Sequence, residues 1–287
     1  MSELTHCQKK QHETVMSITS LSVTAIRALI RSGEMTGQTA GLANGYLQAN
    51  LVILPEQYAL DFARYCQRNP KPCPLVGISN SGNPKFQSLG SDLDLTTDVP
   101  SYNIYEYGKL IRSPHQITDL WQEDFVGFAL GCSHTFEEAL VKRDFDIWHL
   151  LHNQTVPMFK TSIQTVPSQI FSGEMVVTMR AIPRDRLHEA VEISKQFPLA
   201  HGAPVHIGNP AEIGIKDLSQ PDWGDAAPVP EDSTPVFWAC GVTPQIAITN
   251  AELPIAITHK PGSMLITDIH DRAEIPVLDQ EFTLSIT

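Results

Sequence analysis

The chain has 287 residues, and its 32 acidic and 20 basic side chains give a net charge of −12 with neutral histidines. This balance excludes a general nucleic-acid-binding surface or a surface for anionic membranes. No apolar stretch approaches the roughly 20 residues of a membrane span, and the first thirty residues lack the apolar core of a signal peptide, so we expect a cytoplasmic protein.

The length allows a substantial core in one or two domains, and we expect two. The cysteines form no CxxC pair and are odd in number. This pattern favours free thiols over a zinc knuckle or a complete disulfide framework. The five residues are Cys7, Cys66, Cys73, Cys132 and Cys240.

Helices and strands are expected to alternate in the first half of the chain, which favours an α/β fold. Residues 22–32 have the periodicity of an amphipathic helix that ends at Gly33, and Pro55 suits the first turn of a helix over 56–68. Apolar segments also predict strands over 74–79 and 101–111 and a helix over 118–130.

The glycine-rich segment 33–50 is expected to be a loop. It lacks the GxxxxGK[ST] order of a phosphate-binding loop and follows no convincing strand, which disfavours nucleotide binding. Close approach of the backbone to a substrate, or simple packing, explains the glycines better.

The second half of the chain predicts an inserted unit. Residues 175–208 are expected to form a strand, a helix with Pro183 in its first turn, and a second strand. A linker rich in proline and acidic residues follows over 224–235. Strands over 236–241 and 263–269 are then expected to rejoin the central sheet of the first domain.

The segment FWACGVTPQ, residues 237–245, is the strongest candidate for a site. An apolar run breaks abruptly into a turn that gathers small and polar groups, and sites are commonly built where strands end. Cys240 offers a thiol, while Thr243 and Gln245 offer hydrogen-bonding groups able to contact a substrate.

A second candidate is GCSHTFEEAL, residues 131–140, where Thr135 and Glu138 have the spacing of a capping box. Cys132, Ser133 and His134 would then lie at a helix N-terminus, which favours a bound carboxylate and a thiolate. The structural alternative is that the hydroxyls only cap the helix and the thiol packs in the core.

Histidines and aspartates gather in the last third of the chain and are candidates for proton transfer near neutral pH. The same residue types can bind a divalent metal, although no HExxH or comparable spacing is present, so we expect no metal cofactor. A hydrogen-bonding role in a loop is the structural alternative for each. The residues are His201, His206, His259, His270, Asp222, Asp225, Asp268 and Asp271.

Long ordered segments of this chain resemble the D-glutamate cyclase family, whose members are also called hydro-lyases. The resemblance extends from about Gly41 to Ile269. It is carried by QANLVILP (48–55), DFARYCQRNPKPCPL (61–75), GFALGCSHTFEEAL (127–140), FSGEMVVTMR (171–180), HGAPVHIG (201–208), GIKDLSQPDWGD (214–225), PVFWACGVTPQ (235–245) and HKPGSMLITD (259–268).

The resemblance implies a larger three-layer α/β domain, residues 1–129 and 234–287, with an inserted two-layer α+β domain, residues 130–233. It also implies cyclisation of D-glutamate to 5-oxo-D-proline with loss of water. A small carboxylic or amino acid is the implied substrate, and a homo-oligomer is compatible with this assignment. The chain departs from the family pattern at Thr96, Asn103, Lys160 and Ser162, where arginine or asparagine is expected in the family.

For such a reaction we expect His206 or His201 to deprotonate the amine, and Asp222 or Asp268 to protonate the leaving oxygen. Cys132 or Cys240 is an alternative nucleophile that would form a thioester. The expected substrate-binding residues are Ser133, His134, His201, Thr243, Gln245 and His259. A metal-assisted hydro-lyase acting on another acid, and a non-catalytic module that binds a small acid, are the competing functions.

Overall fold

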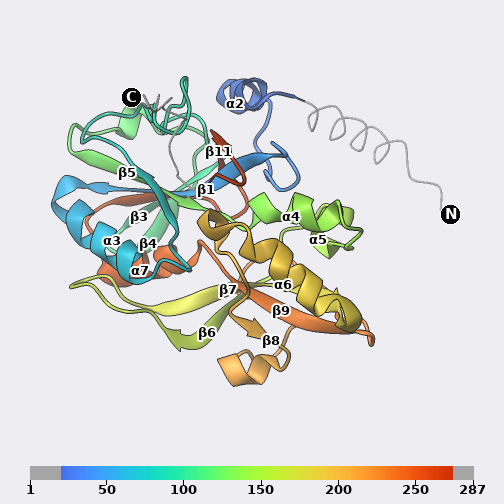
Figure 1. Cartoon of the computed structure of the whole chain (residues 1–287). Helices are drawn as coiled ribbons and strands as arrows, with labels where there is room; N and C mark the ends of the chain where they lie inside the picture. The colour runs from blue at the N-terminus through green and yellow to red at the C-terminus, as the bar shows by residue number, and fades with distance from the viewer. Residues whose placement is uncertain (1–20, 274–287) are drawn as a thin grey trace, which may run out of the picture.

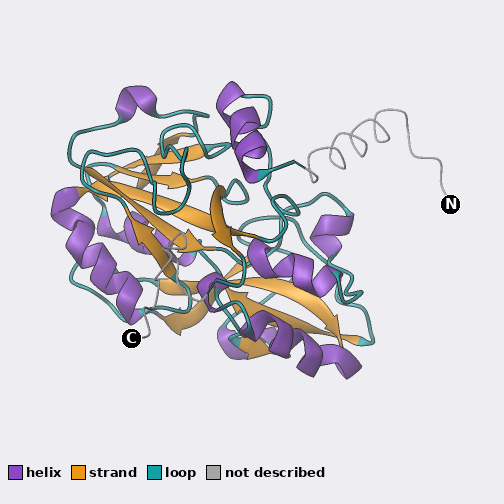
Figure 2. Cartoon of the chain, turned by 45° about the horizontal axis from the view of Figure 1, so that its top comes forward, coloured by secondary structure: helices purple, strands orange, loops and turns teal. Residues whose placement is uncertain are grey.

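The computed structural model describes residues 21–273. The N-terminal residues 1–20, on which the expectation of no signal peptide partly rests, lie outside the described residues, as does Cys7. Two antiparallel sheets lie at the centre, and helices cover them (Figures 1 and 2). This mixture of helices and sheets agrees with the predicted α/β class. The division into a three-layer domain and an inserted domain stays a prediction.

The first sheet has seven strands in the order β2-β5-β1-β10-β3-β4, with β11 also paired to β1. The strands are β1 (Tyr46–Pro55), β2 (Leu75–Ile78), β3 (Tyr102–Glu106), β4 (Lys109–Arg112), β5 (Phe125–Gly131), β10 (Ala256–His259) and β11 (Leu265–His270). Strand β1 is central, and nine of its ten residues are buried. It therefore carries side chains toward both faces of the sheet.

The second sheet has four strands in the order β6-β7-β9-β8. The strands are β6 (Met158–Gln164), β7 (Glu174–Pro183), β8 (His206–Ile207) and β9 (Ser233–Ala239). Strand β11 joins the first sheet as expected. The strand expected over 236–241 does not, because β9 pairs with β7 from Val177↔Ala239 to Pro183↔Ser233.

Six α-helices lie in the described part of the chain: α2 (Val23–Ser32), α3 (Glu56–Arg68), α4 (His134–Val141), α5 (Trp148–Leu151), α6 (Leu187–Lys195) and α7 (Thr243–Ala251). The predicted helices over 22–32 and 56–68 are confirmed. Helix α2 ends at Gly33, which adopts φ 76° and donates its N–H to the Ile30 carbonyl. Glycine reaches this left-handed conformation without a steric penalty.

Three further sequence predictions are wrong. The segment expected to form a helix over 118–130 contains only a short 3-10 turn, Thr118–Leu120, and then strand β5. The expected loop over 33–50 ends in the first half of β1. The capping box is also absent, because Thr135 Oγ1 accepts a hydrogen bond from the Gln48 N–H instead of capping α4.

Helices α4 and α7 each contact both sheets. Phe136 of α4 packs in one core cluster with Leu51 of β1 and Trp238 of β9. Helix α7 contacts β7, and its Ala247 packs with Val52 on the opposite face of β1. The interface between the two sheets is thus filled by the starts of these two helices.

Replacing Gly131 by alanine is expected to destabilise the fold by about 3 kcal/mol, because overpacking forces the backbone to shift. A Cβ at this position would overlap the carbonyl oxygen of Leu199. The midpoint of urea unfolding measures the effect. Gly37→Ala is the matched control, since a Cβ at position 37 has no atom within 4 Å. Equal midpoints for the two variants would contradict this prediction.

Candidate active site

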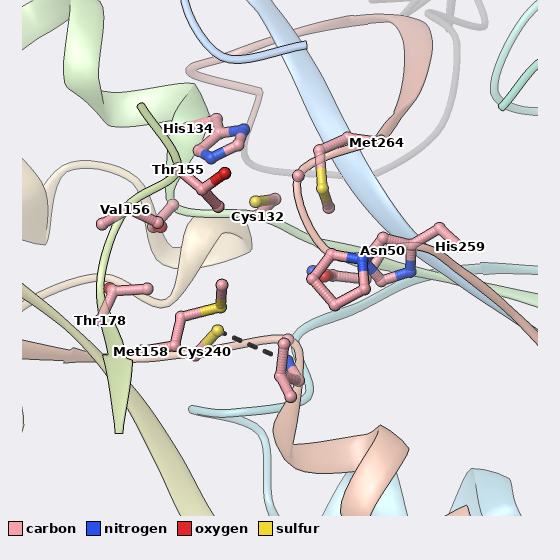
Figure 3. A pocket seen from close by; sticks show the side chains of 15 residues that line it. Asn50, Cys132, His134, Thr155, Val156, Met158, Thr178, Cys240, His259 and Met264 are labelled. Atoms are coloured by element: carbon pink, nitrogen blue, oxygen red, sulfur yellow. Dashed lines mark hydrogen bonds between the residues drawn. The ribbon is translucent and has the colours of Figure 1, made fainter. Parts of the chain in front are cut away.

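A cavity of about 350 Å³, including its opening to solvent, lies between the two sheets. Two similar turns meet there, one from β5 to α4 and the other from β9 to α7 (Figure 3). In each turn a cysteine follows the last residue of a buried strand and a helix begins within three residues. The lining residues are Asn50, Cys132, Ser133, His134, Thr155, Val156, Met158, Thr178, Cys240, Gly241, Val242, His259, Pro261, Gly262 and Met264.

The first turn contains Cys132, Ser133 and His134. The Cys132 N–H donates to the Gln48 carbonyl at 2.9 Å, which ties the turn to strand β1. Burial raises the pKa of the Cys132 thiol to about 12, and the nearby Cys240 adds to the shift. A thiolate was expected at this helix N-terminus, but desolvation outweighs the helix dipole and keeps the thiol protonated.

The second turn contains Cys240 and Gly241. The Val242 N–H donates to Cys240 Sγ at 3.4 Å, and burial raises the pKa of this thiol to about 11. Gly241 lies directly against the Asn50 side chain, which a Cβ at position 241 would overlap. Asn50 in turn donates to the carbonyl of Gly131 at 2.9 Å. Asn50 therefore holds the two turns in register.

Two uncharged imidazoles face the cavity. His134 is 8% exposed, its Nδ1 has no hydrogen-bond partner among residues 21–273, and burial lowers its pKa to about 4. His259 is 1% exposed, and burial lowers its pKa to about 4 as well. His259 Nδ1 lies 3.1 Å from the Leu51 nitrogen and 3.3 Å from the Leu51 carbonyl oxygen, so either tautomer of the neutral ring has a backbone partner. In each neutral ring, one nitrogen accepts and the other donates a hydrogen bond.

The cavity opens into two wider hollows of about 980 and 710 Å³ that share Thr155 and Pro261 with it. The exposed Lys260 lines both hollows. Lys160 lies over the ring of Trp223, with Nζ 5.6 Å from the ring centroid. Positive charge therefore lies at the entrance of a protein with a net charge of −12.

The structure brings many of the predicted site residues together. Cys132, Ser133, His134, Cys240 and His259 line the cavity itself. Gln245 lines the larger hollow, where its Nε2 donates to the His259 carbonyl at 3.3 Å. The two strand-end segments singled out from the sequence thus form opposite walls of one site.

Five predicted residues line neither the cavity nor the two hollows. Thr243 is fully buried, and its hydroxyl accepts a hydrogen bond from the Val176 N–H at 2.9 Å. His201 is held by the Lys71 carbonyl at 2.8 Å, and His206 Nε2 lies 2.8 Å from the Asn209 carbonyl. Asp222 accepts from the Lys160 N–H at 2.8 Å, and Asp268 pairs with Arg27 at 2.7 Å. These groups are engaged in local structure outside the cavity, and their expected roles in the site stay predictions.

The sequence prediction missed Asn50, Thr178 and Met158, which line the cavity, and Arg180 behind it. A polar Asn50 inside the apolar run of β1, and a charged Arg180 inside β7, were the available signals. Buried polar residues inside strands are costly unless they are paired, so such positions mark either an ion pair or a site.

Of the four positions expected to depart from the family pattern, one lines the larger hollow and one lies at its rim. Asn103 lines this hollow, where its Oδ1 accepts from Ser113 Oγ at 2.7 Å, and Lys160 contacts Trp223 of the same hollow. Thr96 donates to Asp94 at 2.7 Å away from the cavity lining, and Ser162 is exposed on β6. Asn103 and Lys160 are thus the departures nearest to an incoming ligand.

Within residues 21–273, no group of three or more His, Cys, Asp and Glu side chains is arranged to hold a metal ion. In the same range, no helix has the length and apolar character needed to cross a membrane. The cytoplasmic location and a homo-oligomeric state stay predictions.

Residues 126–268 match the profile of the D-glutamate cyclase family. Three relatives bear the name "putative hydro-lyase". The protein from Dinoroseobacter shibae is 62% identical over 88% of this chain and 84% of the relative. The one from Ruegeria pomeroyi is 58% identical over 90% of this chain and 94% of the relative. The one from a Jannaschia species is 53% identical over 88% of this chain and 95% of the relative.

The chain belongs to the D-glutamate cyclase family of hydro-lyases. The resemblance found in the sequence is confirmed, and membership supports a lyase function.

Proposed function

We propose that this protein cyclises D-glutamate to 5-oxo-D-proline and water. The observation that carries the proposal is that two helices from opposite sides, α4 and α7, begin at one buried cavity. Helix N-termini attract anions through their unpaired N–H groups and their dipoles. A dicarboxylate has two such anions, so the dipole of one helix can stabilise each carboxylate. At α7 the dipole acts without a free N–H at the first two positions, because the Thr243 N–H donates to the Cys240 carbonyl and Pro244 has no N–H.

The cavity also suits the ammonium group of an amino acid. Burial favours the neutral imidazole of His134, and its Nδ1 has no partner in the described residues. A bound carboxylate beside the ring opposes that shift, because negative charge favours the imidazolium form. His134 is therefore our candidate for the group that accepts protons from the substrate amine.

The reaction balances without a net change in protons. His134 takes a proton from the ammonium group and passes it to an oxygen of the side-chain carboxylate. The amine nitrogen then attacks the carboxyl carbon, the C–N bond forms, and the second amine proton follows the same path. The C–O bond breaks, and the oxygen leaves as water. In the tautomer whose Nδ1 accepts from the Leu51 N–H, Nε2–H of His259 would hydrogen-bond the substrate oxygens that carry charge.

We favour this direct route over a thioester at Cys132 or Cys240. Burial raises both thiol pKa values, to about 12 and about 11, and a thiol is a poorer nucleophile than a thiolate. Cys132→Ser and Cys240→Ser are each expected to retain turnover within about fivefold, because a hydroxyl preserves the size and hydrogen bonding of the thiol. A hydroxyl is a much weaker nucleophile, so the substitutions would stop a reaction that passes through a thioester. Loss of turnover by about 10³-fold in either variant would support the thioester instead.

The predicted two-domain arrangement fits this function, and we propose it with the function. The larger domain would supply Asn50 and His259, and the smaller inserted domain would supply Met158 and Thr178. Binding a substrate between them would then hold both halves of the site together.

The lysines at the entrance are expected to attract the substrate. Lys260→Gln is expected to raise the KM for D-glutamate about fivefold at low ionic strength, and about 0.5 M salt is expected to remove most of the difference. Steady-state kinetics at both salt concentrations measure this effect. Lys195→Gln, which removes an exposed lysine from α6, is the control and is expected to change nothing. A salt-independent change in KM would contradict electrostatic attraction.

The proposed function is tested by chiral mass-spectrometric detection of 5-oxoproline after incubation of the purified protein with D- or L-glutamate, each with and without a chelator. Product from the D form alone, in both conditions, is the expected result. Product that disappears with chelator would favour the metal-assisted hydro-lyase. A ligand-induced rise in melting temperature with no product would favour the binding module.

A further inference from the structure

A buried charged cluster lies directly behind the cavity wall. Arg180 on β7 is 3% exposed, and Glu137 on α4 is 1% exposed. The guanidinium Nε donates to Glu137 Oε1 at 3.1 Å, and Nη2 contacts the same oxygen. His149 Nε2 lies 2.9 Å from this oxygen on the other side. The carboxylate is thus shared between two neighbours, and Arg180 and His149 help to hold the pKa of Glu137 well below its usual range.

Arg180 also reaches the cavity lining. Its Nη2 donates to Ser133 Oγ at 3.1 Å, and its Nη1 donates to Thr178 Oγ1 at 2.9 Å. Both hydroxyl residues line the cavity. The guanidinium therefore connects the turn between β5 and α4, which contains Ser133, with strand β7 of the second sheet.

This contact fixes the role of the Ser133 oxygen toward Arg180. A guanidinium has only donors, so Ser133 Oγ must be the acceptor in its contact with Arg180. The hydroxyl proton of Ser133 is then free to point elsewhere, and no acceptor for it occurs in the described residues. The Thr178 proton differs, since it lies toward the Trp238 carbonyl at 3.5 Å. Ser133 is the hydroxyl left as a donor toward a ligand.

The shape of the arginine matters as much as its charge. The guanidinium carbon lies 5.1 Å from the ring centroid of Phe136 and 5.3 Å from that of Trp238. Between these rings and Glu137, the planar group lies in an orientation that reaches both hydroxyls at once. A lysine ammonium is a point charge without this fork and cannot make the same set of contacts.

We propose that Arg180 is a positioning residue that fixes the Ser133 hydroxyl as a hydrogen-bond donor to one carboxylate of the substrate. The inference rests on the proposed function for the identity of that carboxylate. Glu137 and His149 hold the guanidinium in place from behind, and none of the three needs to touch the substrate.

A double-mutant cycle with glutarate as an unreactive dicarboxylate probe tests this proposal. Calorimetry is expected to show that Arg180→Lys and Ser133→Ala each weaken glutarate binding about 30-fold, since each removes a hydrogen bond to a charged group. The double variant is expected to bind no more than about threefold more weakly than either single variant, because both changes remove one interaction. Ser133→Thr, which keeps the hydroxyl, is expected to restore most of the affinity.

Arg27→Lys is the matched control for a structural effect. Arg27 is also fully buried and pairs with Asp92 and Asp268, but it lies outside the cavity lining. This variant is expected to lower the urea midpoint and leave glutarate affinity unchanged. If Arg180→Lys does not fold, Glu137→Gln replaces it in the cycle, because it loosens the same guanidinium.

Multiplicative losses in the double variant would overturn the proposal, as would a wild-type protein that does not bind glutarate. The turnover assay with D-glutamate separates the two hypotheses. Coupled binding losses without 5-oxoproline would support the role of Arg180 and reject the proposed reaction. Formation of 5-oxoproline together with independent losses of glutarate affinity in the two single variants would support the proposed reaction and reject the role of Arg180.

Discussion

Replacing His134 by glutamine is expected to lower the turnover of D-glutamate by about 10³-fold, which is within the range for removal of a positioned acid–base group. Glutamine keeps a polar group at the start of α4 but cannot carry a proton between the amine and the leaving oxygen. Glutarate affinity is expected to fall far less than turnover, since an unreactive probe needs no proton transfer even though its carboxylate lies beside this ring. Single-turnover kinetics with D-glutamate, together with calorimetry, measure both effects.

His201 provides the control for this prediction. It is also buried, and burial lowers its pKa to about 4, but it lies outside the cavity lining with its Nδ1 held by the Lys71 carbonyl. His201→Gln is expected to retain turnover within about threefold, because only groups at the reacting atoms supply acid–base catalysis. If the two variants lost activity equally, His134 would not be the proton carrier.

The folded state is expected to lose stability steeply between about pH 6.5 and pH 4. Burial lowers the pKa of His134, His201 and His259 from 6.5 to about 4. In this window the unfolded chain binds protons on these rings, whereas the folded chain keeps them neutral, so acid favours unfolding. Three such groups give a slope of roughly 4 kcal/mol per pH unit. Glu137, whose pKa is also lowered, adds a loss of the same sign at still lower pH.

Urea unfolding at several pH values between 7 and 4.5 measures this slope. The variants His201→Gln and His259→Gln test its origin, because each removes one titrating ring. Each is expected to reduce the slope by about a third, whatever its effect on stability at neutral pH. A slope that is unchanged in both variants would assign the acid sensitivity to other groups.

Helices and strands could be predicted from the sequence where one of their faces is buried and the other is exposed. Helices α2 and α3 have a buried and a polar face, so their periodicity is visible. Strand β5 is buried at all seven positions, and its apolar run was mistaken for part of a helix. A fully buried run carries no period, so the distinction depends on tertiary contacts.

The cavity-lining residues could be predicted where a reactive side chain directly follows a strand in the sequence. Cys132 and Cys240 each follow a buried strand, and both line the cavity as their segments suggested. His206 and Asp268 have equally suitable side chains, but their positions depend on sheet order. His206 lies on the edge strand β8, and Asp268 lies on β11, where it pairs with Arg27. Such long-range pairings leave no local pattern in the sequence.

Helices α4 and α7 join the two sheets in a way that affects how the molecule melts. Phe136 of α4 packs in one core with residues of both sheets, while α7 packs Ala247 with Val52 of β1 and Ile246 with Val176 of β7. Neither sheet can therefore lose its packing without disturbing the other. We therefore expect one heat-absorption peak in calorimetry rather than two. A ligand held between the helix starts should shift that single peak as a whole, so melting temperature reports occupancy of the site directly.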